Sequence, residues 1–196
     1  MRDEHERRRQ IMQAAEQLFA SRRFHEITTD EIAATAGVGK GTLYRYFQDK
    51  EDLFHQTAMH GFEELCELLK ADRQEDGPFK DRLLRVCTRI DSFYRRRRKL
   101  FGMMQAEENR LAFKRGRKRE QWRERRRRLT AILVVLLDDA VATGELRADI
   151  APERMVGYLL GMLKGQAFTE PREADANSVA EVVDVFLHGA RPREED

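Results

Sequence analysis

The chain has 196 residues, of which 37% are charged and 8% aromatic, with a net charge of +2 and a mean hydropathy of −0.71. The longest apolar run, residues 131–137, is too short to span a bilayer, and the first ten residues lack the apolar region of a signal peptide. We therefore expect a cytoplasmic protein without membrane or secretory segments.

Apolar residues recur at helical spacing along most of the chain, and only four prolines interrupt it. This pattern predicts an all-α fold of about nine helices. The first helix is expected over about residues 6–21. We expect two domains, a three-helix helix-turn-helix head over residues 1–50 and a larger helical domain over residues 51–196.

The stretch from residue 28 to residue 53 has the spacing of a helix-turn-helix. Thr28 and Glu31 are spaced as a capping box, which predicts the start of a helix. Gly37 follows the last apolar residue, where a chain leaving a helix adopts positive φ at little steric cost. A second short helix is then expected to begin at about Gly39 or Lys40.

The second short helix has the composition of a DNA-reading helix. Leu43 and Phe47, four residues apart, are predicted to face inward and to leave the polar residues on the outer surface. Two glycines beside a cation and a hydroxyl allow a DNA backbone to approach closely. The candidate DNA-binding residues are Thr28, Thr29, Gly39, Lys40, Gly41, Thr42, Tyr44, Arg45, Tyr46 and Lys50.

This stretch resembles the TetR-like family of bacterial transcriptional regulators, and the close resemblance covers about the first 60 residues. One departure is Gly39, where the family more often has a capping serine. The matching residues are Leu18, Phe19, Thr28, Thr29, Ile32, Ala33, Ala36, Gly37, Val38, Gly41, Thr42, Leu43, Tyr44, Tyr46, Phe47, Lys50, Leu53 and Phe54.

The fourth helix is expected to run from about Lys50 to Ala71 and to belong to both domains. Five more helices are expected beyond it, the sixth over about residues 100–113 and the seventh over about 120–143, ended by Gly144. Cys66 and Cys87 each lie at apolar helical positions, so we interpret them as reduced core residues rather than a disulfide.

The eighth predicted helix carries glycines at every fourth residue, which places them on one face. Glycine destabilises a helix by roughly 1 kcal/mol relative to alanine, so close helix packing should offset it. We predict a two-fold dimer interface, and the resemblance also implies a homodimer built from the last two helices. Close packing inside one subunit is the alternative. The candidate interface residues are Gly157, Tyr158, Gly161, Met162, Gly165, Val182, Val183 and Phe186.

Large, adaptable apolar residues cluster on the helices between the head and the dimer face. The resemblance implies a ligand pocket there, and these side chains favour an apolar or amphipathic effector. Ordinary core packing is the more common role for any one of them. The candidate pocket residues are Phe93, Phe101, Met103, Met104, Phe113, Trp122 and Met155.

Residues 95–128 carry sixteen Lys or Arg and only four Asp or Glu. A solvated surface, partly salt-bridged against the acidic C-terminal region, is the first interpretation. An anion site for an effector that joins a phosphate to an apolar tail, such as an acyl-coenzyme A, is the second. Non-specific attraction to DNA backbone is the third.

No pattern typical of an enzyme is present: the five histidines form no zinc-protease motif, and phosphate-loop, nucleophile-elbow and dinucleotide fingerprints are missing. We expect neither catalytic residues nor a metal or cofactor. The prediction is a dimeric transcriptional regulator, a repressor that binds an inverted-repeat operator in double-stranded DNA and is released by a small effector. A basic helical nucleoid protein is the alternative, and would bind DNA regardless of sequence.

Overall fold

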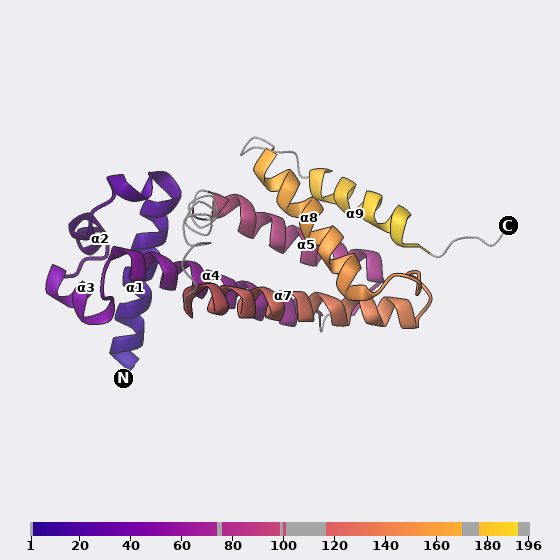
Figure 1. Ribbon diagram of the computed structural model, residues 1–196, viewed down its shortest axis with the longest axis horizontal. Coiled ribbons are helices and arrows are strands. Elements are labelled where there is room, and N and C mark those ends of the chain that lie inside the picture. Colours follow the sequence, from indigo (N-terminus) through magenta and orange to yellow (C-terminus); the bar gives the residue numbers. More distant parts are fainter. Residues whose placement is uncertain (1, 74–75, 99, 101–116, 170–176, 192–196) are drawn as a thin grey trace. The chain divides into compact units, whose positions relative to one another are not determined.

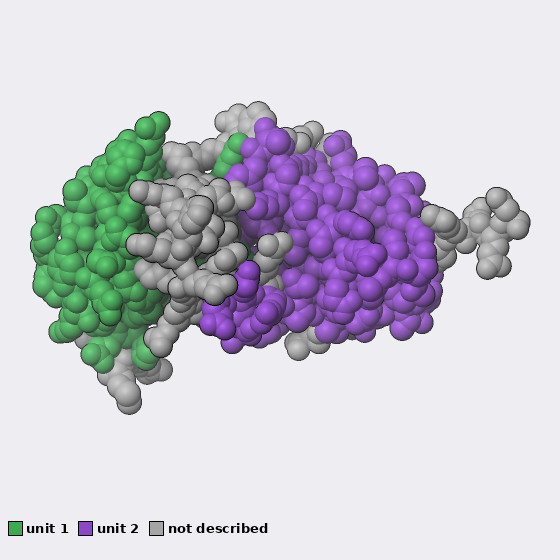
Figure 2. All heavy atoms as spheres, in the orientation of Figure 1, with its two compact units in different colours: residues 1–62, 97–119 green, residues 63–96, 120–196 purple. Residues whose placement is uncertain are grey.

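The computed structural model describes residues 2–73, 76–98, 100, 117–169 and 177–191, and every regular element in these ranges is a helix (Figure 1). The predicted all-α fold is confirmed. The chain forms two compact units, unit 1 with residues 1–62 and 97–119, and unit 2 with residues 63–96 and 120–196 (Figure 2). The domain boundary after residue 50 stays a prediction.

Unit 1 contains α1 (Arg2–Ser21), a 3₁₀ turn (Phe24–Glu26), α2 (Thr29–Thr35), α3 (Lys40–Tyr46) and the first half of α4 (Lys50–Arg73). Helix α2 packs against both α1 and α3. Each helix of unit 1 contributes apolar side chains to the core, as the helical spacing predicted. The most deeply buried core residues are Ile11, Phe19, Ile27, Ile32, Leu43, Phe47 and Leu53.

Unit 2 contains the second half of α4, together with α5 (Phe79–Arg96), most of α7 (Arg117–Ala142), α8 (Pro152–Thr169) and α9 (Asn177–Ala190). Helices α5, α8 and α9 pack against one another (Figure 1). Helix α4 therefore contributes residues to both units, as expected. The core residues with at most 1% exposure include Leu83, Cys87, Ile90, Leu133, Leu136, Leu137, Val156, Leu159, Leu163 and Val183.

Two glycines end helices in the predicted way. Gly37 after α2 has φ of 65° and Gly144 after α7 has φ of 76°. After α2, the N–H groups of Gly37 and Val38 donate to the carbonyls of Ala34 and Ala33. The same paired bonds follow α7. These are Schellman ends, which require a left-handed residue and satisfy the last carbonyls of the helix.

The predicted sixth helix falls almost entirely on residues 101–116, outside the described residues. Cys66 and Cys87 are both unpaired and buried, as predicted, and burial raises the pKa of each thiol. Among the described helices, none combines the length and apolar character needed to cross a membrane.

Candidate functional site

The start of α2 is fixed by a reciprocal capping box. The N–H of Glu31 donates to Thr28 Oγ1 over 3.2 Å, while the N–H of Thr28 donates to the Glu31 carboxylate over 2.8 Å. Arg22 also donates to Glu31 over 2.9 Å. Hydrogen bonds first from Arg22 and then from Thr28 lower the pKa of Glu31 to about 2. The carboxylate therefore ties the end of α1 to the start of α2.

Helix α3 presents its polar residues to solvent. Leu43 and Phe47 are buried in the core of unit 1, whereas Tyr44 is 45% exposed. Lys40, Gly41 and Arg45 are also exposed, and Thr42 and Tyr46 are half-buried. The predicted division of the helix into an inner apolar and an outer polar face is confirmed by this burial.

Two side-chain contacts hold the polar face of α3 against α2. Lys40 Nζ lies 2.9 Å from Asp30 Oδ2, and the hydroxyls of Thr29 and Tyr44 lie 3.1 Å apart. The hydrogen bond to Asp30 raises the pKa of Lys40. Asp30 was not among the predicted site residues, because a contact between two helices leaves no periodic signal in the sequence.

The glycines at the start of α3 have open surroundings. Gly39 is the N-cap residue of α3 and supplies no side-chain cap. Among the described residues, no heavy atom lies within 4 Å of the place where a Cβ would stand on Gly39 or Gly41. Packing among the residues that the structure describes therefore does not explain why these two positions lack a side chain.

Lys50 is placed differently from the other candidate DNA-binding residues. Its ammonium donates to the carbonyls of Phe24 and Ile27, over 2.9 and 2.8 Å, and lies 4.4 Å from the centre of the Phe24 ring. Two of its three N–H donors are thus used inside unit 1. The cation holds the connection between α1 and α2, and its contact with DNA stays a prediction.

The glycines of α8 form an exposed stripe within unit 2. Gly157, Gly161 and Gly165 are all exposed, and no described heavy atom lies within 4 Å of an added Cβ on any of them. Tyr158 beside them is 57% exposed. Met162 is half-buried. Close packing among the described residues of one subunit does not account for the stripe.

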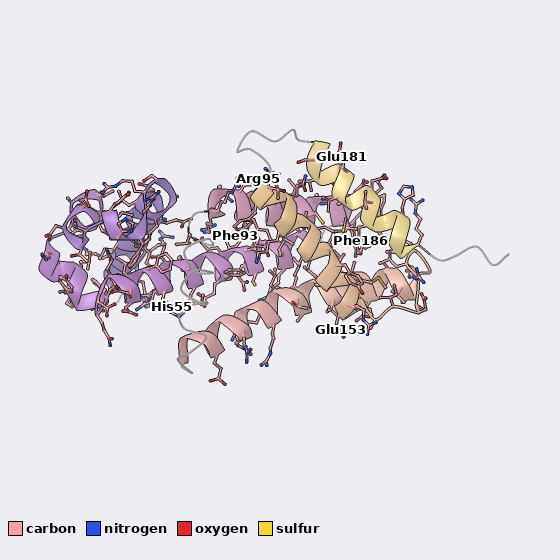
Figure 3. All side chains as sticks on the ribbon, turned by 45° about the horizontal axis from the view of Figure 1, so that its top comes forward. His55, Phe93, Arg95, Glu153, Glu181 and Phe186 are labelled. Atoms are coloured by element: carbon pink, nitrogen blue, oxygen red, sulfur yellow. The ribbon has the colours of Figure 1, made fainter. Side chains whose placement is uncertain are left out.

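The candidate interface residues on α9 divide between core and surface. Val183 and Phe186 are 1% and 6% exposed, because this side of α9 packs against α5 and α8; Figure 3 labels Phe186. Val182 is half-buried. Val185, which was not predicted, is 62% exposed. Within the candidate interface region of α9, Val182 and Val185 are thus the valines that stay accessible in this protomer.

The predicted effector residues are only partly described. Phe93 on α5 and Met155 on α8 are 2% and 1% exposed, and Phe93 is labelled in Figure 3. Four others lie outside the described residues: Phe101, Met103, Met104 and Phe113. For Trp122 only its place in α7 is described. A pocket formed by these seven residues stays a prediction.

A hollow of about 620 Å³ lies elsewhere on unit 2. Arginine and apolar side chains of α7 line it, together with Glu153 of α8, which Figure 3 labels. Of the predicted effector residues with described side chains, neither Phe93 nor Met155 lines it. Its lining residues are Arg123, Arg127, Thr130, Ala131, Val134, Val135 and Glu153.

Several arginines of the basic region form ion pairs. Arg95 Nε lies 2.6 Å from Asp91 Oδ2 in the last turns of α5, and both side chains are largely buried. Arg127 and Arg128 lie 3.5 and 3.8 Å from Glu124 in exposed pairs on α7. The acidic partners lie three or four residues from the arginines in sequence. In these three pairs the arginines therefore do not bind the acidic C-terminal region, as the first interpretation had expected.

Comparison with known proteins shows that the N-terminal region is similar to a family of bacterial regulators. Residues 11–57 match the family model described as "Bacterial regulatory proteins, tetR family". The chain is 31% identical over 80 residues to the fatty acid metabolism regulator protein of Bacillus subtilis, covering 41% of each chain. It is 47% identical over 49 residues to the transcriptional repressor BepR of Brucella suis, covering 25% of this chain and 23% of that one. The matched part thus spans at most about two fifths of these relatives.

Solved structures extend the likeness of fold over nearly the whole chain. A putative TetR-family regulator from Mesorhizobium loti aligns with a TM-score of 0.77 at 20% identity, covering 95% of each chain. The regulator FadR from Bacillus subtilis, in complex with stearoyl-CoA, aligns with a TM-score of 0.73 at 22% identity, covering 93% of this chain and 98% of that one. The helical domain that follows the head therefore has the same fold as in these regulators.

Proposed function

The chain belongs to the tetR family of bacterial regulatory proteins, and we propose on this premise that it is a repressor which binds an inverted-repeat operator as a homodimer. Regulators, not enzymes, are the relatives that it matches. Such a protein acts in the cytoplasm on double-stranded DNA.

The observation that carries this proposal is the exposed polar face of α3. Lys40, Thr42 and Tyr44 lie in its first turns, where a recognition helix meets base edges in the major groove. Arg45, Tyr46 and the capping residues Thr28 and Thr29 flank them, in the position of phosphate contacts. The bare glycines 39 and 41 leave space that a DNA backbone could fill.

Dimerisation is the second part of the proposal. The glycine stripe of α8, with Tyr158 and the exposed Val185 of α9, supplies an unfilled surface that a second copy would cover. Two heads related by a two-fold axis read two half-sites, which predicts an inverted repeat.

Selection from a pool of random DNA duplexes at about physiological salt tests the proposal. An enriched inverted repeat is expected, and duplexes with only one half-site should bind much more weakly. Retention without any motif would favour the nucleoid-protein alternative, because binding through phosphates alone does not distinguish sequences. The variant Tyr44→Ala with Arg45→Ala should lose the motif while remaining folded, since both side chains are exposed.

The effector that we propose is amphipathic, with an apolar chain and an anionic group. One relative is named for fatty acid metabolism, and the structure of another regulator holds stearoyl-CoA. Buried Phe93 and Met155 and the excess of arginine over residues 95–128 fit such a molecule. Titrating stearoyl-CoA into the operator complex should release the DNA, whereas coenzyme A alone should not. Release by neither compound would remove this effector class from the proposal.

A further inference from the structure

Arg97 lies at a place where the chain passes from one unit to the other. It directly follows Arg96, the last residue of α5, and the division between unit 2 and unit 1 falls between these two residues. The chain also passes between the units inside α4, between Phe62 and Glu63. Within unit 1, the side chain of Arg97 contacts Gly61, next to that second passage.

Any side chain at position 61 would displace the guanidinium of Arg97 from its present place. A Cβ on Gly61 would lie 2.6 Å from Arg97 Nε, 2.8 Å from Cζ and 2.9 Å from Nη2. Among the described glycines, Gly61 is the one with atoms within 4 Å of an added Cβ. A glycine here, inside α4, is thus explained by the guanidinium that lies across it.

The same guanidinium forms an ion pair with α1. Arg97 Nη2 lies 2.8 Å from Glu16 Oε1 and 3.0 Å from Glu16 Oε2. The side chain of Arg97 is only 9% exposed and that of Glu16 is 30% exposed. Breaking a largely buried pair by removing one partner leaves an uncompensated charge, which is strongly unfavourable. Arg97 therefore connects the first helix of the head to α4.

We propose that Arg97 is a positioning residue for DNA binding, which holds α1 on α4 within unit 1. The Asp91–Arg95 ion pair lies in the last turns of α5, just before Arg97. This inference rests on the proposed function, because its test measures affinity for the operator.

The test compares three full-length variants that break the contact in different ways: Arg97→Met, Glu16→Gln and Gly61→Ala. Arg96→Gln is the matched control, since Arg96 is exposed and its guanidinium donates to the carbonyl of Ser92 within α5. Affinity for the selected operator and hydrogen exchange of the α1 amides without DNA are measured for each. The three variants should bind the operator about tenfold more weakly or worse, and lose a similar factor of protection in α1. Arg96→Gln should change neither.

A double-mutant cycle distinguishes loss of the Arg97–Gly61 contact from a general loss of folding. With Arg97 truncated to alanine, nothing obstructs a Cβ at position 61, so adding Gly61→Ala should cause no further loss of affinity and should raise helix stability. The proposal is overturned if Gly61→Ala is equally harmful with and without Arg97. Faster exchange in α1 with unchanged operator affinity also overturns it.

The outcome is distinguishable from failure of the proposed function. If the wild-type protein enriches no operator, the function fails, yet exchange in α1 still reports whether Arg97 holds this helix. Unchanged exchange in all three variants overturns the inference whether or not DNA is bound.

Discussion

Lys40 at the start of α3 is paired with Asp30 of α2, with 2.9 Å between Nζ and Oδ2. The pair links the two short helices of the candidate DNA-binding motif, and both side chains are more than half exposed. An exposed pair of this kind contributes little to stability. Its importance lies in where it holds the cation, beside the polar face of α3.

Replacing Asp30 by asparagine should strengthen DNA binding. In the wild-type protein a phosphate must compete with Asp30 for the Lys40 ammonium, and the aspartate itself repels DNA. We expect Asp30→Asn to raise operator affinity by about two- to tenfold at low salt, with a smaller gain at high salt because charges are screened. Fluorescence anisotropy over a series of salt concentrations measures this. Weaker binding would show instead that Asp30 orients Lys40 for contact.

Lys50 and Lys40 should respond differently to the same substitution. Lys50→Met removes donors to two carbonyls in unit 1, so we expect a loss of about 1–3 kcal/mol in unfolding free energy. Lys40→Met should leave stability nearly unchanged but lower the slope of log affinity against log salt by about one per half-site. Urea unfolding and salt titration distinguish the two. If Lys50→Met lowered the slope of log affinity against log salt as much as Lys40→Met does, Lys50 would be a phosphate contact.

The pH dependence of stability should include a contribution from Glu31. Its pKa falls from 4.5 to about 2 on folding, so its charged form stabilises the native state fully above pH 4.5. This stabilisation is lost as the pH falls through about 2. Glu31→Gln should therefore be less stable than wild type at pH 7, with the difference shrinking between pH 4.5 and pH 2. Arg22→Gln should produce the same trend, and the double variant should add little.

Gly161→Leu should separate the proposed dimer. The position is exposed and has open space beside it in the described protomer, so leucine fits within one chain but would collide with a helix packed on the stripe. Sedimentation at micromolar concentration should show a monomer. Asp138→Leu, an exposed apolar substitution on α7, is the control and should remain dimeric. An unchanged dimer in Gly161→Leu would exclude the stripe as the interface.

Phe186→Ala should weaken folding, whereas Val185→Ser should weaken dimerisation. Phe186 is 6% exposed in the protomer, so its truncation should cost about 3–5 kcal/mol through a cavity in unit 2. Val185 is 62% exposed, so serine there should leave folding nearly unchanged and weaken dimerisation. Urea unfolding at several protein concentrations separates the two effects. If only Phe186→Ala lost stability in a way that depends on protein concentration, Phe186 rather than Val185 would belong to the dimer interface.

Sequence reasoning succeeded where partners are neighbours along the chain. The capping box of Thr28 and Glu31 spans three residues, and the left-handed ends at Gly37 and Gly144 depend on the turn just before them. The inner face of α3 follows from the four-residue spacing of Leu43 and Phe47. Short-range hydrogen bonds and helical periodicity are encoded locally, so these features could be predicted without a structure.

Other features depend on helices that are distant in sequence. Val183 and Phe186 have the apolar character of an interface, but the packing of α9 on α5 and α8 turns them into the protomer core and leaves Val185 outside. Lys50 has the charge of a DNA contact, and only the path of residues 24–27 shows that it binds two carbonyls. Arg97 belongs to a run of four arginines in sequence, and it is the 81-residue separation from Glu16 that hides its role. Charge and hydropathy identify which residues can make a contact, but their partners are chosen by the tertiary fold, because burial and ion pairing depend on neighbours in space.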